Sequence, residues 1–263
     1  MQSKIQSYLP GDHPWQNQII WYDVIDSTNT QAKKLALEGA PHGTVLVADC
    51  QTGGRGRLGR SFQSPGGMGV YMSVILRPQC PADQLMHLTC AAAVAACDAV
   101  EKAVGFRPGI KWTNDLVHEK RKLAGILTEL VLLPEKTVAI IGIGINCCQT
   151  LSDFSADIQS FAGSLHMVTQ APVDRVKVAA ALIEAFSDMS LQLLRGKHDM
   201  IRRYRDNCVT LGQDIKLLCT DTVSYGHAED INADGALLVR FPDGNIREVT
   251  AGEVSVRGMY GYN

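Results

Sequence analysis

Apolar positions recur with two different spacings along the chain up to about residue 208. Short runs rich in Val, Ile and aromatic residues predict strands at residues 19–25, 44–48, 69–76, 122–130 and 138–145. Longer segments with helical spacing predict helices at residues 81–104, 174–195 and 199–206. Residues 148–172 follow neither spacing and are expected to be irregular. Strands and helices are therefore expected to be mixed along this part of the chain.

The pattern changes after residue 208. Short β runs alternate with turns at residues 214–218, 223–228, 236–241 and 246–249. Asp234-Gly235 and Asp243-Gly244 are strong hairpin signals between these runs. We therefore predict two domains, residues 1–208 and residues 209–263, the second a small antiparallel barrel.

Composition narrows the class of protein. Of the 263 residues 46% are apolar, and the net charge is −2, so the chain has no global basic field for nucleic acid. Residues 1–10 lack the apolar segment of a signal peptide, and the longest apolar runs are too short to cross a bilayer. The eight cysteines form no C-x-x-C pair. We expect a cytoplasmic protein with no membrane partner, whose cysteines are buried free thiols.

One loop carries most of the chemistry. Residues 51–62, the Gly/Arg loop, contain four glycines and three arginines, which are Gly53, Gly54, Gly56, Gly59, Arg55, Arg57 and Arg60. The glycines allow close backbone approach, and the arginines suit phosphate or carboxylate, so the loop predicts an anionic ligand. Residues 54–59 also match G-x-G-x-x-G. The dinucleotide-binding interpretation is rejected because no helix begins at the third glycine and no acidic residue follows at the required distance.

Polar residues flank the predicted strands at three other places. Ser27-Thr28-Asn29 precedes a helical segment, and either caps that helix or offers its free N–H groups to an acidic ligand. Thr28 with Gln31 matches a capping box, and Gly39 would end the helix.

In residues 110–116, the sequence Thr113-Asn114-Asp115 predicts a kink or bulge. Lys122 starts a strand that contains Gly125, and is either a solvated turn lysine or a site residue. Gly142 and Gly144, in a strand that ends at Asn146, indicate close packing or a ligand.

Together these segments resemble the biotin protein ligases, also called biotin–acetyl-CoA-carboxylase ligases. The resemblance runs from about Trp21 to Arg257, and the Gly/Arg loop and the Lys111-Trp112 stretch are its most specific parts. It implies an α+β fold, in which a mixed or antiparallel sheet with flanking helices is related to class II aminoacyl-tRNA synthetases. A small C-terminal SH3-like β-barrel is implied to follow.

The resemblance also implies a role for each matching residue. The implied biotin-binding residues are Ser27, Thr28, Asn29, Gln51, Arg55, Gly56, Arg57, Lys122 and Gly125. The implied ATP-binding residues are Arg55, Arg57, Arg60, Phe62, Lys111, Trp112, Asn114 and Asn146. Lys122 and Arg57 are implied to be catalytic, and Asp115 to be a metal ligand. The chain departs from the family in carrying Thr113 where Pro is usual and Phe62 where Trp is usual.

The implied activity is ATP-dependent formation of biotinyl-5′-AMP, followed by transfer of biotin to a lysine of a biotin carboxyl carrier protein domain. Mg²⁺ would bridge the β- and γ-phosphates of ATP. A homodimer is compatible with the family. Too few residues precede residue 19 for a helix-turn-helix domain, so we expect the short form, which does not bind DNA.

Two other functions are compatible with parts of the sequence. A lipoate or octanoate ligase would share the fold, but the Gly/Arg loop argues against it. A non-catalytic module could bind phosphate or nucleic acid through the arginines, but 6% aromatic residues and near-neutral charge weaken that interpretation. The chain contains no Met-Lys dipeptide, so it is not expected to be a biotin carrier itself.

The Gly/Arg loop is also expected to act as a lid. Each ordered residue costs about 1–2 kcal/mol of conformational entropy, and glycine loses the most. Between Gln51 and Arg60 the sole apolar residue that could offset this cost is Leu58. The ligand is therefore expected to order the loop.

Overall fold

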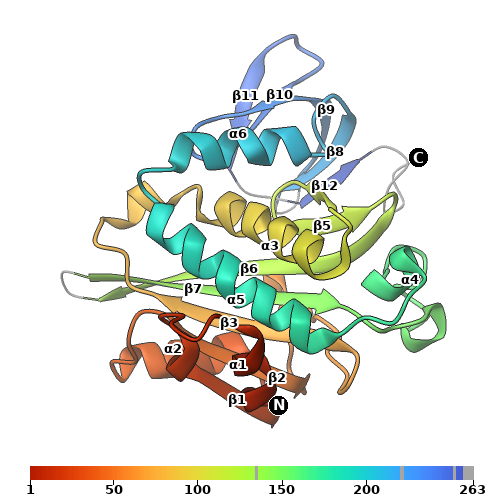
Figure 1. Cartoon of the computed structure of the whole chain (residues 1–263). Coiled ribbons are helices and arrows are strands. Elements are labelled where there is room, and N and C mark those ends of the chain that lie inside the picture. Colours follow the sequence, from red (N-terminus) through yellow and green to blue (C-terminus); the bar gives the residue numbers. More distant parts are fainter. Residues whose placement is uncertain (134–135, 220–221, 251–252, 257–263) are drawn as a thin grey trace.

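The chain forms two sheets, which a computed structural model describes over residues 1–133, 136–219, 222–250 and 253–256. The larger sheet has the strand order β1-β2-β3-β7-β6-β5-β4 (Figure 1). Strands β1 and β2 are parallel, and every other neighbouring pair is antiparallel. The strands are β1 (Ile19–Ile25), β2 (Thr44–Gln51), β3 (Gly69–Leu76), β4 (Gly109–Lys111), β5 (Asp115–His118), β6 (Arg121–Leu133) and β7 (Lys136–Asn146).

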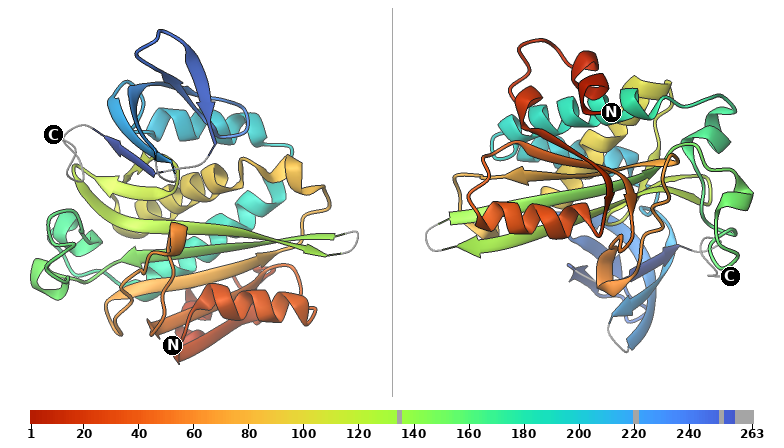
Figure 2. Two further views of the ribbon diagram at one scale, coloured as in Figure 1. Left: turned by 180° about the vertical axis from the view of Figure 1, so that it is seen from behind. Right: turned by 90° about the horizontal axis from the view of Figure 1, so that it is seen from below.

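Helices cover the two faces of this sheet unequally. Helices α1, α3 and α5 lie on one face, and α2 lies on the other (Figure 2). The helices are α1 (Gln2–Tyr8), α2 (Thr28–Leu37), α3 (Leu88–Val104), α4 (Leu165–Thr169), α5 (Arg175–Gln192) and α6 (Lys197–Asn207).

Alternation along the strands explains how both faces become buried. Val47, Val74 and Ile141 belong to the large core under α3 and α5. The neighbouring positions Leu46 and Ile75 belong to a second core, which packs against α2. Successive strand residues point to opposite faces, so one apolar run supplies both cores. Since α2 is short, it covers only part of its face and leaves the rest for the site.

Helix α2 begins one residue earlier than the sequence predicts. Its N-cap is Ser27, whose side chain accepts a hydrogen bond from the backbone N–H of Thr30 at 3.5 Å. The predicted capping box of Thr28 and Gln31 is therefore wrong, because Thr28 is the first helical residue. Gly39 adopts a φ of +95° just after the helix, which confirms its predicted role in ending it.

Several local features differ from the prediction. The predicted kink or bulge at residues 113–115 is a full turn, which joins β4 and β5 in a tight hairpin, and a register shift between Leu116 and Val117 follows it. The segment predicted to be irregular contains α4 and a short 3-10 helix, Leu151–Asp153, and Gly196 is the N-cap of α6 instead of ending α5. Helix α1 was missed because it buries a single side chain, Ile5, and so carries no periodic apolar pattern.

The smaller sheet is antiparallel, with the order β11-β10-β9-β8-β12. Its strands are β8 (Asp214–Cys219), β9 (Thr222–Ile231), β10 (Leu237–Arg240), β11 (Ile246–Val249) and β12 (Glu253–Val256). Gly235 and Gly244 adopt φ values of +87° and +82°, as expected of the predicted hairpin turns. The predicted fold class is confirmed, and the predicted boundary at residues 208 and 209 falls between α6 and β8. Arg257, the end of the resemblance, lies outside the described residues.

The two sheets share one continuous hydrophobic core. Ile215 and Val239 of the smaller sheet belong to the same cluster of buried side chains as Leu88 and Cys90 of α3. Arg205 of α6 adds polar contacts, because its guanidinium donates to the carbonyl of Ile231. The smaller sheet is thus packed directly against the helices of the larger one.

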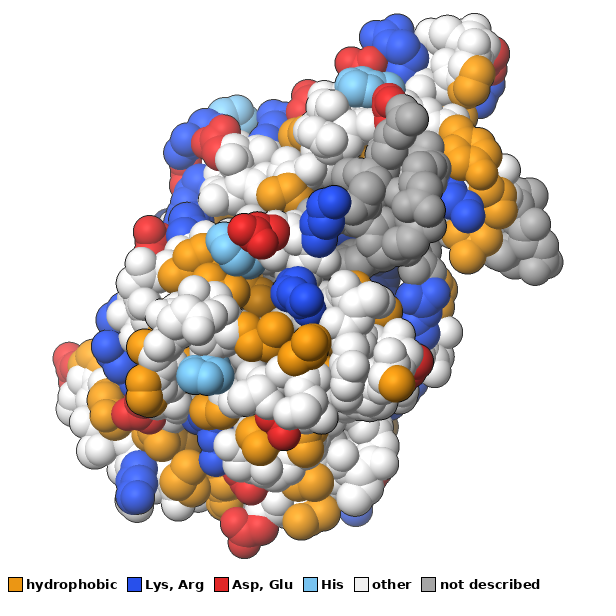
Figure 3. All heavy atoms as spheres, turned by 90° about the vertical axis from the view of Figure 1, so that its right-hand side faces the viewer, with side chains coloured by type: hydrophobic (Ala, Val, Ile, Leu, Met, Phe, Trp, Pro, Cys, Tyr) orange, Lys and Arg blue, Asp and Glu red, His pale blue; other side chains and the backbone are white. Residues whose placement is uncertain are grey.

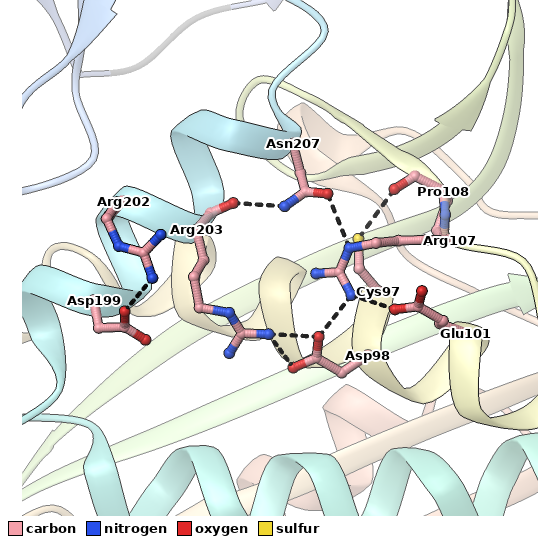
Figure 4. Close-up of polar contacts among 9 residues, drawn as sticks. All are labelled: Cys97, Asp98, Glu101, Arg107, Pro108, Asp199, Arg202, Arg203 and Asn207. Atoms are coloured by element: carbon pink, nitrogen blue, oxygen red, sulfur yellow. Dashed lines mark hydrogen bonds and ion pairs between the residues drawn. The ribbon is translucent and has the colours of Figure 1, made fainter.

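A polar network joins α6 to α3 beside this interface (Figure 4). The Arg203 guanidinium donates to both oxygens of Asp98, at 2.6 and 2.7 Å. Arg107 donates to the same carboxylate at 2.8 Å, to Glu101 at 2.7 Å and to Asn207 at 2.9 Å. Arg107 lies two residues before the start of β4, so the network fixes the start of that strand against both helices.

The described cysteine side chains are free thiols. Cys90, Cys97, Cys147 and Cys208 are buried, and burial raises the pKa of Cys97 to about 12. Desolvation also raises the pKa of the other three, so all four stay protonated at neutral pH. The side chain of Cys219 lies outside the described residues.

Charged side chains of both signs share the surface. On the face shown in Figure 3, Lys and Arg are interspersed with Asp and Glu. This mixing accords with the net charge of −2. Among the described residues, no helix combines the length and apolar character needed to span a bilayer.

Candidate active site

The floor of the site consists of glycines on adjacent strands. Gly125 of β6 pairs with Gly144 of β7. Gly142 precedes Gly144 by two residues in β7 and therefore lies on the same face of the sheet. A Cβ atom at position 142 would lie 2.0 Å from Asn29 Oδ1, and one at 144 would lie 2.5 Å from the Phe62 ring. The close packing predicted at these glycines is therefore confirmed, because α2 contacts Gly142 and the Gly/Arg loop contacts Gly144.

Above this floor lies a cavity of about 630 Å³. The structure brings all of the sequence-predicted site residues to its walls. They are Ser27, Thr28, Asn29, Gln51, Arg55, Gly56, Arg57, Arg60, Phe62, Lys111, Trp112, Asn114, Asp115, Lys122, Gly125 and Asn146. The volume falls in the range usual for small-molecule sites, about 300–1,000 Å³.

One end of the cavity is polar but uncharged. The backbone N–H of Thr28 donates to Gln51 Oε1 at 2.8 Å, and Gln51 Nε2 donates to Ser64 Oγ at 2.9 Å. Ser73 Oγ, from β3, lies 2.7 Å from Thr28 Oγ1. The uncharged end thus presents hydroxyl and amide groups, and the hydrogen bonds between these groups fix their orientations. Sequence reasoning missed Ser73, although a small polar side chain in an otherwise apolar and aromatic strand was its available signal.

Asn29 is held tightly within the protein at this end. Its Oδ1 lies 2.6 Å from Ser73 Oγ, and its Nδ2 donates to the carbonyl of Leu127 at 3.2 Å and to Glu129 at 2.9 Å. Glu129 in turn forms a 2.5 Å ion pair with Lys33 of α2. Both amide hydrogens of Asn29 are therefore used internally, so this side chain fixes the start of α2 on the glycine floor.

The opposite end of the cavity is cationic. Among the described lining residues, five cations outnumber two carboxylates, Asp115 and Asp157; the cations are Arg55, Arg57, Arg60, Lys111 and Lys122. Lys122 Nζ lies 2.7 Å from Asp115 Oδ1. Arg57 donates to Asn114 Oδ1 at 3.0 Å. This excess of positive charge suits an anionic ligand, and two of the cations are oriented by the β4–β5 hairpin.

The Gly/Arg loop folds back on itself over the cationic end. The backbone N–H of Gly56 donates to the carbonyl of Arg60 at 2.7 Å, and that of Phe62 to Gly54 at 2.9 Å. Leu58, at the tip, is 73% exposed, so it contributes little burial. The Phe62 ring anchors the base of the loop on the glycine floor.

Residues 154–162 form a further wall that the sequence did not predict. Phe154, Ile158 and Phe161 from this segment line the cavity. The backbone N–H of Lys122 donates to the carbonyl of Phe161 at 2.6 Å, which ties the wall to the start of β6. The segment has no regular period, so the two aromatic residues were its sole sequence signal. Val254 of β12 also reaches the cavity, a long-range contact that no local pattern indicates.

Few of the described side chains around the cavity could bind a metal ion. Within the described ranges, no group of three or more His, Cys, Asp or Glu side chains could hold one. Asp115 and Asp157 are the carboxylates that line the cavity. Mg²⁺ commonly uses one or two carboxylates together with substrate phosphates, so this donor set fits an ion that arrives with a nucleotide.

Comparison with sequence families identifies the class of protein that this fold and cavity define. Residues 21–146 match the Biotin/lipoate A/B protein ligase family, and residues 210–257 match the biotin protein ligase C terminal domain. Both matches coincide with the parts of the chain that form the two sheets.

Individual relatives narrow the class further. The chain is 34% identical over 240 residues to the bifunctional ligase/repressor BirA of Bacillus subtilis, covering 90% of this chain and 74% of that protein. It is 30% identical over 234 residues to the biotin–[acetyl-CoA-carboxylase] ligase of Mycobacterium tuberculosis, covering 87% and 85%. The biotin protein ligase of Aquifex aeolicus in complex with biotin and ATP superposes with a TM-score of 0.78 at 30% identity, covering 91% and 98%. The chain belongs to the biotin protein ligase family.

Filling the glycine floor should damage the uncharged end of the cavity. In Gly142→Ala the new methyl group meets Asn29 Oδ1, which cannot move because its amide is held on both sides. Such overpacking costs about 1–3 kcal/mol, and because it displaces the start of α2 that binds the ligand, the dissociation constant for biotin should rise about fivefold or more. Calorimetric titration with biotin measures this, with Gly11→Ala as control because a Cβ there meets nothing within 4 Å. Equal biotin affinity in both variants would contradict the packing argument.

Proposed function

We propose that this protein activates biotin with ATP and transfers it to a lysine of a biotin carboxyl carrier domain. The observation that carries the proposal is a single cavity with an uncharged polar end and a cationic end. Biotin has a neutral ureido ring at one end and a carboxylate at the other. ATP supplies the phosphates that the cations would hold. The family membership of the chain supports the same assignment.

The uncharged end is the proposed biotin-binding end. A ureido ring needs hydrogen-bond donors and acceptors without charge, which Ser27, Thr28 and Gln51 supply from α2 and β2. The biotin carboxylate would then extend over Gly125 toward Lys122 and Arg57. Asn29 would act mainly by fixing the start of α2, because its amide hydrogens are already used.

In the first step a carboxylate oxygen of biotin attacks the α-phosphorus of ATP. The bond from phosphorus to the bridging oxygen breaks, and pyrophosphate leaves. Negative charge develops at phosphorus and on the leaving group, so Lys122 and Arg57 would stabilise the transition state. Their contacts to Asp115 and Asn114 hold both cations in place before the ligand arrives. Mg²⁺ bound to ATP would neutralise the phosphates, with Asp115 as the nearby carboxylate.

In the second step the neutral amine of the acceptor lysine attacks the acyl carbon. The acyl–phosphate bond breaks, AMP leaves, and the amine loses a proton to water. The enzyme needs no nucleophile of its own. The buried cysteines accord with this, because their raised pKa values keep them as unreactive thiols.

Pyrophosphate exchange with different acids tests the proposed substrate. Purified protein should catalyse ATP–pyrophosphate exchange that depends on biotin, whereas lipoate and octanoate should support little exchange. The uncharged polar end is the physical reason, because a simple acyl chain would leave its hydrogen-bonding groups unpaired. Faster exchange with lipoate or octanoate than with biotin would reassign the protein to the other branch of the family.

Removal of the Lys122 charge tests its catalytic role. Lys122→Met keeps most of the stem and removes the cation. Losing a charge contact in the transition state should cost on the order of 3 kcal/mol, roughly a hundredfold in the exchange rate. Lys120→Met is the matched control, because Lys120 is exposed in the preceding turn. If folded Lys122→Met exchanges as fast as the control, the assignment is wrong.

Limited proteolysis tests the lid. Trypsin should cut the free protein at Arg55, Arg57 or Arg60, since the loop tip is exposed and buries little apolar surface. Biotin plus ATP should slow this cut strongly, biotin alone partly, and ATP alone hardly at all. Cleavage at exposed Lys136, far along the chain, serves as the internal reference. A free protein as resistant as the complex would mean that the loop is preformed.

A further inference from the structure

The turn of the β4–β5 hairpin supplies the oxygens that orient two site cations. Asn114 Oδ1 accepts from Arg57 at 3.0 Å, and Asp115 Oδ1 lies 2.7 Å from Lys122 Nζ. The position of this turn therefore sets where both positive charges lie in the cavity. On the cavity side, Asn114 Nδ2 donates to the carbonyl of Ile126 at 2.8 Å.

The other side of the turn is held from α6 and the C-terminal domain. The backbone N–H of Trp112 donates to Thr210 Oγ1 at 2.9 Å, and its indole N–H donates to the carbonyl of Gly235 at 3.0 Å. The hydroxyl of Tyr204 donates to the carbonyl of Thr113 at 3.0 Å. Thr210 and Tyr204 are both fully buried. Water therefore cannot replace either hydroxyl without opening the interface.

The same interface also supports the edge strand β4. The backbone N–H of Val209 donates to the carbonyl of Ile110 at 2.9 Å, and Ile110 forms a parallel bridge with Cys208. Arg107, just before the strand, is held by the network in Figure 4. The hairpin is thus anchored along its outer edge by the chain that leads into the C-terminal domain.

We propose that Thr210 and Tyr204 are positioning residues that align Arg57 and Lys122 for the nucleotide through the Trp112–Asn114 turn. The inference rests on the proposed function, because the alignment matters for adenylate formation. The biotin end is fixed separately, by Ser73 and Gln51 against the start of α2. Biotin meets Arg57 and Lys122 through its carboxylate alone, so loss of a hydroxyl at the hairpin should weaken ATP binding more than biotin binding.

Thr210→Val and Thr210→Ser form a matched pair for the test. Valine keeps the shape of threonine but leaves the buried Trp112 N–H without an acceptor, whereas serine keeps the hydroxyl. In biotin-dependent pyrophosphate exchange, Thr210→Val should raise the KM for ATP about tenfold, while Thr210→Ser stays within about twofold. The dissociation constant for biotin, measured by calorimetry without ATP, should rise by no more than about threefold in Thr210→Val, because only its carboxylate lies near the two cations, and should stay within about twofold in Thr210→Ser.

Tyr204→Phe is a second, independent variant, and it tests the proposal if Thr210→Val does not fold. It removes the hydroxyl at Thr113 and should raise the KM for ATP in the same direction, with biotin affinity retained. Unchanged KM for ATP in the folded variants would overturn the proposal, as would equal losses of biotin and ATP binding, which indicate general destabilisation. Absence of exchange in the unsubstituted protein would instead overturn the proposed function.

Discussion

The site depends on the close contact between the start of α2 and the glycine floor. Gly142 has no side chain, so Asn29 can rest directly on the sheet and connect β3, β6 and α2 through its amide. Hydrogen bonds between uncharged groups then connect Ser73 to Thr28 and Thr28 to Gln51. Because these groups hydrogen-bond one another, and Ser73 and Thr28 are buried, their orientations are set before a ligand arrives, while the hydroxyls keep free acceptor capacity for it. The uncharged end of the cavity is thus a rigid consequence of strand register.

The cationic end is built on a different principle. Its charges come from a glycine-rich loop and from the start of β6, and both are restrained by the β4–β5 hairpin. The loop tip buries little, since Leu58 faces solvent. One end of the cavity is therefore preformed, while the loop that covers the other end has little burial to hold it. That contrast suits the reaction in two ways. A closed loop keeps water away from the phosphate and the acyl adenylate, and an open loop lets the products leave.

Much of this architecture could be predicted from the sequence, and the failures have physical causes. The five longer strands of the larger sheet and the Gly/Arg loop were predictable because continuous runs of β-branched and apolar residues and glycine–arginine clusters are local signals. Helix α1 was missed because one buried side chain, Ile5, gives no period. The wall at residues 154–162 and the approach of Val254 were missed because contacts distant in sequence create them. The network around Asn29 was likewise not predictable, since it joins α2, β3 and β6, which are far apart in the sequence.

Thr113 stands where the family usually has proline, and this difference makes the hairpin turn depend on its contacts. Proline, usual at this position in the family, would fix φ of the turn by itself. Threonine restricts that rotation less, so more of the geometry of the turn must come from its surroundings. Trp112 and Thr113 receive those restraints from Thr210, Gly235 and Tyr204. In this chain α6 and the C-terminal domain thus contribute, through hydrogen bonds to Trp112 and Thr113, part of the rigidity that a covalent ring would otherwise provide.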